Sequence, residues 1–280
     1  MTQSTEVIKM TVKEKDGNVI LSSPECFDVR LSVFCGQAFR WTERDGVIHG
    51  VVGNKAADII QTENEVIFKN TDLKAFEKIF VPYFDLSRDY NKILTSFNDK
   101  YIRLACREYY GIRILKQDEW EALCSFIISQ NNNIPRICKI IERLCASFGE
   151  ELKNGDYAFP SYKVLAALNE SDLAPLRAGF RAKYILDAAK KLSCGEVSLE
   201  KIKTLPLEEA RNELMKIKGV GKKVAECTLL YGFGRLDAFP VDVWVRRILD
   251  ELYDGELPKC ADGYRGVAQQ YLFHWRRNLP

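Results

Sequence analysis

The sequence predicts an α+β protein in which an antiparallel β-sheet domain with connecting helices spans residues 1–115 and a helical region spans residues 116–280. Two observations lead to this fold class. Short segments rich in β-branched and aromatic residues, with turn residues around them, fill the first part of the chain. From about Leu73 onward the apolar residues recur at helical spacing, and no strong strand pattern follows residue 115.

Five short segments are the predicted strands: Val19–Leu21, Phe27–Phe34, Val47–Val52, Asp58–Gln61 and Glu65–Lys69. Residues that favour tight turns lie around them, in Asp16-Gly17, Asp45-Gly46 and Thr62-Glu63-Asn64. Short strands joined by such turns pair with their neighbours in the chain, so we expect an antiparallel sheet.

Apolar residues at helical spacing predict the helices after residue 115. Between Asp118 and Gln130, for example, one helical face carries Trp120, Leu123, Cys124, Ile127 and Ile128. The same periodicity predicts further helices over Ile134–Phe148, Tyr162–Leu168, Ala182–Leu192, Leu207–Ile217, Lys222–Phe233, Val243–Leu249 and Gly263–Trp275.

Composition excludes several classes of protein. A chain of 280 residues with 46% apolar residues can bury a large core, and no stretch is long enough to predict a membrane span. Nine cysteines without a CxxC pair indicate reduced core residues in a cytosolic protein. The net charge of +2 is too small to indicate a nucleic-acid partner, so any such footprint must be a local cluster of basic residues.

The stretch from Leu214 to Cys227 predicts two helices joined by Lys218-Gly219-Val220-Gly221, which is a helix-hairpin-helix. Glycines in the turn leave the amides at the start of the second helix open to a phosphate. We therefore expect the DNA backbone to be bound by Gly219, Val220, Gly221 and Lys222. A plain turn with glycine caps is the alternative. A dinucleotide fingerprint is excluded, because a helix precedes the glycines and Val224 replaces the third one.

Two charged residues beyond this turn are candidates for chemistry. Lys223 stands in the first turn of the second helix, and a lysine amine can attack carbon. Asp242 follows a loop in the segment Pro240-Val241-Asp242 and begins the next helix. The alternatives are a phosphate contact for Lys223 and an ordinary N-cap for Asp242, although an N-cap can also be catalytic.

The series Gly219-Val220-Gly221, Lys223 and Pro240-Val241-Asp242 resembles the helix-hairpin-helix-GPD superfamily of DNA glycosylases. This resemblance implies a helical region of two lobes, with Lys223 as nucleophile and Asp242 as the essential carboxylate. In that superfamily the lysine marks bifunctional enzymes, which remove a base and also act as lyases on the DNA strand.

Three further stretches resemble the 8-oxoguanine DNA glycosylase family: Gly36–Trp41 (GQAFRW), Gln130–Arg136 (QNNNIPR) and Ala268–Phe273 (AQQYLF). The resemblance implies that the Gly36 carbonyl accepts the N7 hydrogen that 8-oxoguanine has and guanine lacks. It also implies that Gln269 reads the pairing edge of the flipped base, while Phe273 and Cys227 sandwich its ring. An ordinary core aromatic is the alternative for Phe273.

The same resemblance assigns residues to the strand opposite the lesion. Asn131 and Arg136 would fill the space left by the flipped base and bind the orphaned cytosine, with Arg181 on its other side. Phe180, at a position that is often tyrosine in the family, would wedge into the base stack. We therefore expect a preference for 8-oxoguanine opposite cytosine.

The implied reaction is lysine attack at C1′, a Schiff base and β-elimination, with no metal and no organic cofactor. Only Cys260 lies beyond Cys227, whereas the iron–sulfur members of the superfamily carry four clustered cysteines there. The expected partner is double-stranded DNA containing 8-oxoguanine, bound by a monomer with no membrane contact, in the cytoplasm or nucleoid, or in the nucleus of a eukaryote. The alternatives are a glycosylase for another oxidised or alkylated base and a non-catalytic hairpin protein.

One departure from the family pattern leads to a separate hypothesis. Trp244 and Arg276 replace a histidine and an acidic residue that are common in the family. We expect the Arg276 guanidinium to stack on the Trp244 indole and to join the two helices that carry them.

Overall fold

The computed structural model describes residues 10–279, which form two compact units. The first unit contains residues 10–52, 56–116 and 241–279, and the second contains residues 53–55 and 117–240. The division of the chain into a sheet domain that ends at residue 115 and a helical region that follows it stays a prediction. The structure adds that the C-terminal segment from residue 241 packs with the first unit rather than with the helices that precede it.

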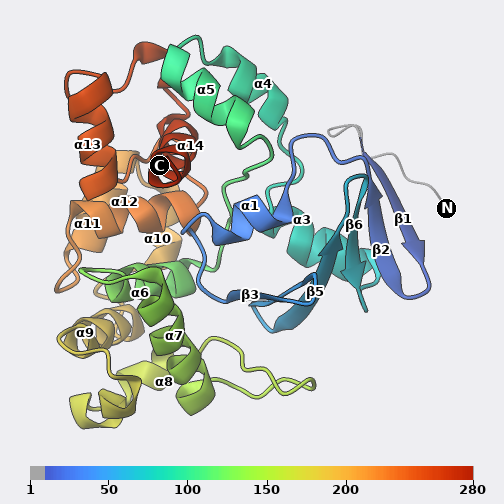
Figure 1. Ribbon diagram of the computed structural model, residues 1–280. Coiled ribbons are helices and arrows are strands. Elements are labelled where there is room, and N and C mark those ends of the chain that lie inside the picture. The colour runs from blue at the N-terminus through green and yellow to red at the C-terminus, as the bar shows by residue number, and fades with distance from the viewer. Residues whose placement is uncertain (1–9, 280) are drawn as a thin grey trace. The chain divides into compact units, whose positions relative to one another are not determined.

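The first unit is built on one six-stranded sheet, shown in blue and teal in Figure 1. Its strands follow the order β1-β2-β6-β5-β4-β3, and the recorded pairings are antiparallel. The expected α+β class is thereby confirmed. The strands are β1 (Thr11–Lys15), β2 (Asn18–Ser22), β3 (Trp41–Arg44), β4 (Val47–Val52), β5 (Lys55–Gln61) and β6 (Glu65–Lys69).

The predicted strand over Phe27–Phe34 is wrong, because these residues include helix α1 (Val29–Phe34). The Asp28 carboxylate caps the helix by accepting from the Leu31 amide at 2.7 Å. The residues that α1 buries are Val29, Ser32 and Val33, at the i, i+3, i+4 spacing of a helix rather than the alternation of a strand. Strands β1 and β3, which were not predicted, are mostly exposed and pair across the Asp16-Gly17 and Asp45-Gly46 turns.

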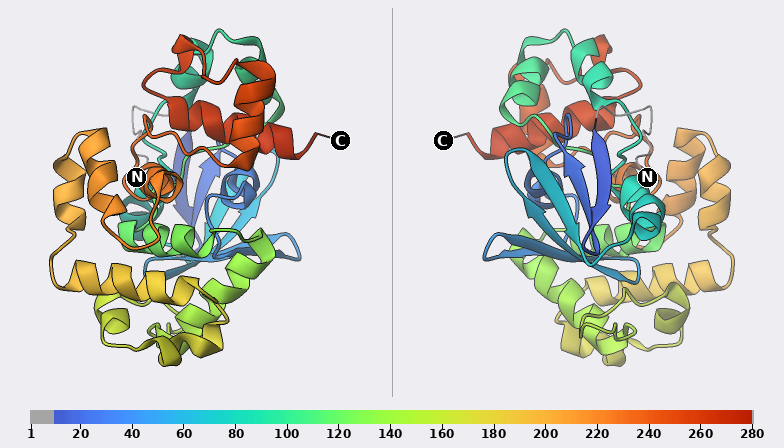
Figure 2. Two further views of the ribbon diagram at one scale, coloured as in Figure 1. Left: turned by 90° about the vertical axis from the view of Figure 1, so that its left-hand side faces the viewer. Right: turned by 90° about the vertical axis from the view of Figure 1, so that its right-hand side faces the viewer.

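Helices from both ends of the first unit's sequence complete it. Helix α14 (Arg265–Arg277) packs against α5 (Lys100–Glu108) and α13 (Val243–Leu252), as the red and green helices of Figure 2 show. The buried Tyr271 hydroxyl donates to the Ile112 carbonyl at 2.7 Å. Under the sheet, Phe68 forms ring contacts with Phe76, Phe80 and Phe84. The remaining elements are α2 (Leu73–Ala75), a π-helical turn η1 (Phe76–Phe80), α3 (Val81–Tyr83), α4 (Tyr90–Ser96) and η3 (Lys259–Ala261).

The second unit is helical, as predicted, with one isolated β-bridge between Glu151 and Tyr157. Helix α6 lies at its centre and contacts α7, α9 and α12. Within residues 10–279 no helix has the length and apolar character needed to cross a membrane. The helices are α6 (Glu119–Ile128), α7 (Ile134–Phe148), α8 (Tyr162–Ala166), η2 (Glu170–Leu176), α9 (Arg181–Ser193), α10 (Leu199–Thr204), α11 (Leu207–Met215) and α12 (Lys222–Tyr231).

Candidate active site

The predicted hairpin joins α11 to α12, and helix α9 supports its turn. The Asp187 carboxylate of α9 accepts from the Lys218 amide at 2.7 Å, and the Lys191 amine donates to the Lys216 carbonyl at 2.6 Å. Gly219 has a φ of 80°, and a Cβ at this position would lie 2.3 Å from the Tyr184 ring. The turn is therefore held against α9, while Gly221 and Lys222 remain exposed at the N-terminus of α12.

Lys223 is half-buried in the first turn of α12, and its side chain reaches the end of α6. The Nζ atom donates to the Ser129 hydroxyl at 3.2 Å and lies 5.3 Å from the centre of the Phe126 ring. Lys222, its neighbour in sequence, is exposed. The two lysines are thus in different environments. Of the two, Lys223 has its amine in recorded contacts with the side chains of Ser129 and Phe126.

The segment of residues 130–136 follows Ser129 directly, and Arg181 holds its first two residues in place. Arg181 is buried, and its guanidinium donates to the carbonyls of Gln130, Asn131 and Ala178. An arginine has five N–H groups, and the four recorded bonds leave at most one for another partner. Burial and the nearby charge of Arg136 both lower the pKa of this guanidinium.

Arg136 and Phe180, in contrast, are exposed. The Arg136 guanidinium makes one long contact of 3.5 Å with the Arg177 carbonyl. The Phe180 side chain stands at the start of α9, 43% exposed, with the Arg181 guanidinium 4.5 Å from its ring centre and the Tyr184 ring 5.8 Å away. The second unit therefore places Asn131, Arg181 and Phe180 in one contacting group.

A buried ion pair holds the loop that leads to Asp242. The Glu226 carboxylate of α12 pairs with Arg211, and its other oxygen accepts from the Phe239 amide at 2.7 Å. Glu226 is almost fully buried, so the hydrogen bonds of these partners replace the water that its carboxylate loses. The pair fixes the chain three residues before Asp242.

Asp242 is the N-cap of α13. Its Oδ1 atom accepts from the amides of Trp244 and Val245 at 2.9 and 2.8 Å. One oxygen of the carboxylate makes both recorded capping bonds. Capping is therefore compatible with a second task for the other oxygen.

The hypothesis that Arg276 stacks on Trp244 is wrong. Arg276 forms an ion pair with Glu251 at 3.1 Å, and the guanidinium over the indole, 5.3 Å from the ring, is that of Arg247. Arg247 reaches the indole because it stands three residues further along the same helix. Glu251 belongs to α13 and Arg276 to α14, so the two helices are joined by an ion pair in place of the expected stacking.

The predicted base-binding residues are divided between the two units. Gly36, with a φ of 93°, the buried Gln269 and the half-buried Phe273 belong to the first unit. The Arg277 guanidinium lies 5.3 Å from the centre of the Phe273 ring. Cys227 is buried in α12 of the second unit and forms no disulfide. In the part of the chain that the structure describes, no three His, Cys, Asp or Glu side chains form a group that could hold a metal.

Two family models cover most of the chain. The N-terminal domain of 8-oxoguanine DNA glycosylase matches residues 19–123, and the HhH-GPD superfamily of base excision DNA repair proteins matches residues 124–257. A probable N-glycosylase/DNA lyase of Methanothermobacter thermautotrophicus is 31% identical over 82% of this chain and 83% of its own length.

Solved structures give the same result. The structure of MBOgg1 in complex with a low-affinity DNA ligand is 41% identical, with a TM-score of 0.89 over 96% of this chain and 98% of that one. The Clostridium acetobutylicum 8-oxoguanine glycosylase/lyase, bound to double-stranded DNA with cytosine opposite 8-oxoguanine, is 37% identical, with a TM-score of 0.89 over 95% and 97%. The chain belongs to the 8-oxoguanine DNA glycosylase family. It is a DNA N-glycosylase with lyase activity.

Three contacts made by the predicted site residues and their neighbours were not predicted from the sequence. Ser129 receives the Lys223 amine, the Glu226–Arg211 pair holds the loop before Asp242, and Gln270 bonds to the carbonyl of Cys35 beside Gly36. Ser129 directly precedes the segment of residues 130–136 that resembles the family, so its position in the sequence could have indicated that it belongs to the site. The other contacts join residues far apart in sequence, and no local pattern indicates them.

Proposed function

We propose that this glycosylase/lyase removes 8-oxoguanine from double-stranded DNA, preferably opposite cytosine, with Lys223 as nucleophile and Asp242 as the stabilising carboxylate. The observation that supports this most is the position of Lys223. Its half-buried amine follows the hairpin glycines and is held by Ser129, whereas Lys222 beside it is exposed. A nucleophile needs such a defined position more than a phosphate contact does.

The reaction begins when the lesion is flipped out of the duplex. The uncharged Lys223 amine attacks C1′ as the bond to the base breaks, and the base leaves with the electron pair and takes up a proton. The negative charge of Asp242 stabilises the positive charge that develops on the sugar. Loss of a proton from the lysine nitrogen and ring opening then yield a Schiff base. This cation acidifies C2′, so that β-elimination expels the 3′ phosphate.

Separate groups read the lesion and the base opposite it. The Gly36 carbonyl accepts from N7–H, Gln269 binds the pairing edge, and Phe273 and Cys227 contact the ring. On the opposite strand Arg136 donates to cytosine and Phe180 fills the stack. Arg181 has at most one N–H left, so its main role in this proposal is to hold Asn131. The related Clostridium acetobutylicum enzyme was solved with cytosine opposite 8-oxoguanine, which agrees with this preference.

The amides of the exposed Gly221 and Lys222, together with the Lys222 side chain, bind the phosphates of the same duplex, whereas the Val220 amide already donates to the Ile217 carbonyl at 3.0 Å. We further propose that the enzyme acts as a monomer, in the compartment that holds the DNA.

Incubation with a duplex that contains one 8-oxoguanine, followed by borohydride, tests the proposal. We expect release of the base, a strand nick and a covalent adduct between protein and DNA, all faster opposite cytosine than opposite adenine. Release of a different damaged base would assign another substrate to the same chemistry. DNA binding without release or an adduct would leave only a non-catalytic hairpin protein.

A further inference from the structure

Two buried glutamines hold the chain on both sides of Gly36. Gly36 has a φ of 93°, a conformation that favours glycine, and a residue without a side chain has little of its own to fix its orientation. We infer that Gln37 and Gln270 are positioning residues, which fix the direction of the Gly36 carbonyl and so determine how well the enzyme separates 8-oxoguanine from guanine. This inference rests on the proposed role of that carbonyl.

Gln37 follows Gly36 and is fully buried. Its Nε2 atom donates to the carbonyls of Ser32 and Arg113 at 2.8 and 2.7 Å, and its Oε1 atom accepts from the Leu115 amide at 2.9 Å. Both N–H groups and the carbonyl of the side chain are therefore used. Because donors and acceptor face partners of opposite kind, the amide has one favourable orientation, and Gln37 ties the end of α1 to residues 113–115.

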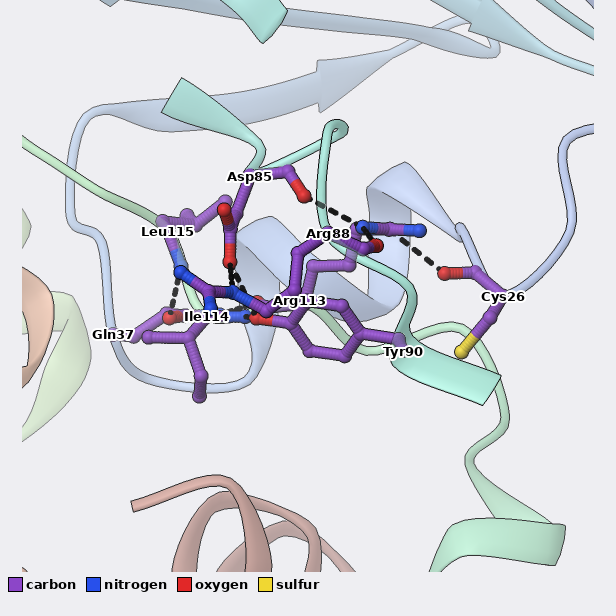
Figure 3. Close-up of polar contacts among 8 residues, drawn as sticks. All are labelled: Cys26, Gln37, Asp85, Arg88, Tyr90, Arg113, Ile114 and Leu115. Atoms are coloured by element: carbon purple, nitrogen blue, oxygen red, sulfur yellow. Dashed lines mark hydrogen bonds and ion pairs between the residues drawn. The ribbon is translucent and has the colours of Figure 1, made fainter. Parts of the chain in front are cut away.

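The segment to which Gln37 is tied is itself held firmly (Figure 3). The guanidinium of Arg113 is buried and donates to the carbonyls of Cys26 and Asp85 at 2.9 and 2.7 Å. It also lies 4.6 Å from the centre of the Tyr90 ring, and the Tyr90 hydroxyl accepts from the Ile114 amide at 3.0 Å. These four interactions make residues 113–115 a fixed reference for Gln37.

Gln270 holds the other side of Gly36. This buried residue of α14 donates from Nε2 to the carbonyl of Cys35 at 3.1 Å, and that carbonyl belongs to the peptide plane that enters Gly36. Gln269, the proposed reader of the pairing edge, precedes Gln270 on the same helix. The bond therefore joins the segment that carries the Gly36 carbonyl to the helix that carries the second base contact.

The Cys35 thiol beside Gly36 also carries no negative charge at neutral pH. The Cys35 thiol points back to the Ser32 carbonyl at 3.3 Å. Burial is the largest cause that raises the pKa of this thiol, to about 12, so it keeps its proton at neutral pH. No thiolate then competes with the Gly36 carbonyl for the N7 hydrogen of the lesion.

Lesion recognition by a single hydrogen bond depends on this support. Hydrogen bonds weaken steeply when their angle falls below about 120°, so a carbonyl that can rotate does not hold the N7–H of the lesion. Such a carbonyl can also turn away from the N7 lone pair of guanine, so that it no longer repels the undamaged base. Loss of either glutamine contact is therefore expected to reduce excision of 8-oxoguanine, while chemistry that needs no base is unaffected.

Three variants of the full-length enzyme test this inference: Gln37→Met, Gln270→Met and, as matched control, Gln61→Met. Gln61 is a hydrogen-bonded glutamine of the same unit, whose amide contacts Val29 and Asp28 and makes no recorded contact with residues 35–37. Two rates are measured for each variant: single-turnover excision from an 8-oxoguanine·cytosine duplex, and β-elimination at a preformed abasic site. The abasic site uses the lyase chemistry but presents no base to Gly36.

We expect Gln37→Met and Gln270→Met to lower excision about 10-fold or more, which is the effect of losing the one hydrogen bond between the Gly36 carbonyl and N7–H of the lesion. Abasic-site cleavage should stay within about twofold of the wild-type rate. Gln61→Met should leave the ratio of the two rates unchanged. The affinity ratio of 8-oxoguanine to guanine duplexes, measured in a Lys223→Gln background, should fall for the first two variants alone.

A parallel loss of both rates would reduce the glutamines to a structural role, and unchanged rates would overturn the inference. If Gln37→Met melts far below the wild type, Gln270→Met decides alone, because it tests the same carbonyl from a different element, helix α14. A wild-type enzyme that cleaves abasic sites but releases no 8-oxoguanine would instead overturn the proposed function.

Discussion

The hairpin of the second unit and the Gly36 segment of the first both present backbone groups to DNA in the proposed function, but they are built differently. The hairpin offers N–H groups at the start of α12, where Gly221 and Lys222 are exposed. The Gly36 segment offers a carbonyl, and buried side chains hold the residues on both sides of it. One region attracts an anion, and the other must reject a base that differs from the lesion at N7 by one hydrogen.

This difference follows from the physics of the two interactions. Attraction between a helix N-terminus and a phosphate acts over several ångströms and tolerates some movement. A hydrogen bond that discriminates between two bases depends on angle as well as distance, so it needs a rigid frame. We expect substitutions at the hairpin to change the affinity for all DNA. Substitutions of the proposed catalytic and base-contacting residues should instead change the rate at which the lesion is excised.

The largest effect is expected from Lys223→Gln, which should abolish both excision and borohydride trapping. The variant has no amine to attack C1′ or to form a Schiff base. The measurement is single-turnover release of 8-oxoguanine together with denaturing electrophoresis of the trapped adduct.

Lys222→Gln is the matched control, because it removes an exposed lysine one position away. It should weaken DNA affinity, with a smaller dependence on salt, and leave the adduct intact. An inactive Lys222→Gln enzyme beside an active Lys223→Gln enzyme would show that Lys222, and not Lys223, is the nucleophile.

Asp242→Asn should lower the excision rate on the order of 10²–10³-fold while lesion affinity is largely kept, because a charge that acts in the transition state affects rate more than binding. Asparagine retains the oxygen that accepts from Trp244 and Val245, so α13 should remain capped. Thermal unfolding checks the cap, and single-turnover kinetics check the rate. Near-normal excision would leave Asp242 with capping alone.

Arg136→Gln should reduce the preference for cytosine opposite the lesion by roughly 1–3 kcal/mol, which is about 5- to 150-fold. Arg136 is exposed and makes one long contact in the structure, so the substitution removes little that holds the fold. Excision rates opposite all four bases measure the preference. An unchanged preference would show that Arg136 does not read the opposite base.

Arg181→Gln provides the contrast to Arg136→Gln, because Arg181 is buried whereas Arg136 is exposed. It removes a buried guanidinium from three backbone carbonyls and should lower thermal stability as well as excision opposite every base.

The sequence predicted the helices more reliably than the strands. In the second unit the apolar period gave α7 at its observed bounds and α6, α9 and α12 within about two residues. Strands β1 and β3 were missed because their residues are mostly exposed and polar, although the turns beside them were recognised. The sequence predicts a strand over the residues of α1 because they are rich in β-branched and aromatic side chains, whereas the Asp28 carboxylate caps a helix there.

The candidate site divides in the same way. The sequence points to Lys223, Asp242 and Gly36 because each lies in a short local stretch that resembles the family. The contacts that support them depend on packing: Gln270 and Cys35 are 235 positions apart, and Lys223 and Ser129 are 94 apart. The spacing of apolar residues along a helix or strand does not indicate contacts between residues so far apart in the sequence. The pairing of Arg276 with Glu251 rather than Trp244 has the same cause, since nothing in the sequence indicated which α13 side chain faces Arg276.

The smallest effect, and the sharpest test of the hairpin, is expected from comparing its two glycines. Gly219→Ala places a Cβ 2.3 Å from the Tyr184 ring at a φ of 80°, so the free energy of unfolding should fall by at least about 1–2 kcal/mol. At Gly221 nothing lies within 4 Å of the added carbon and φ is −94°, so Gly221→Ala should unfold like the wild type. The added methyl group would nevertheless stand beside the amides proposed to bind phosphate. If that proposal is right, Gly221→Ala weakens binding to lesion-containing and undamaged duplex alike, while the ratio of the two affinities stays unchanged. Normal affinity in Gly221→Ala, measured by fluorescence anisotropy over a range of salt concentrations, would instead make the hairpin a plain turn between two helices.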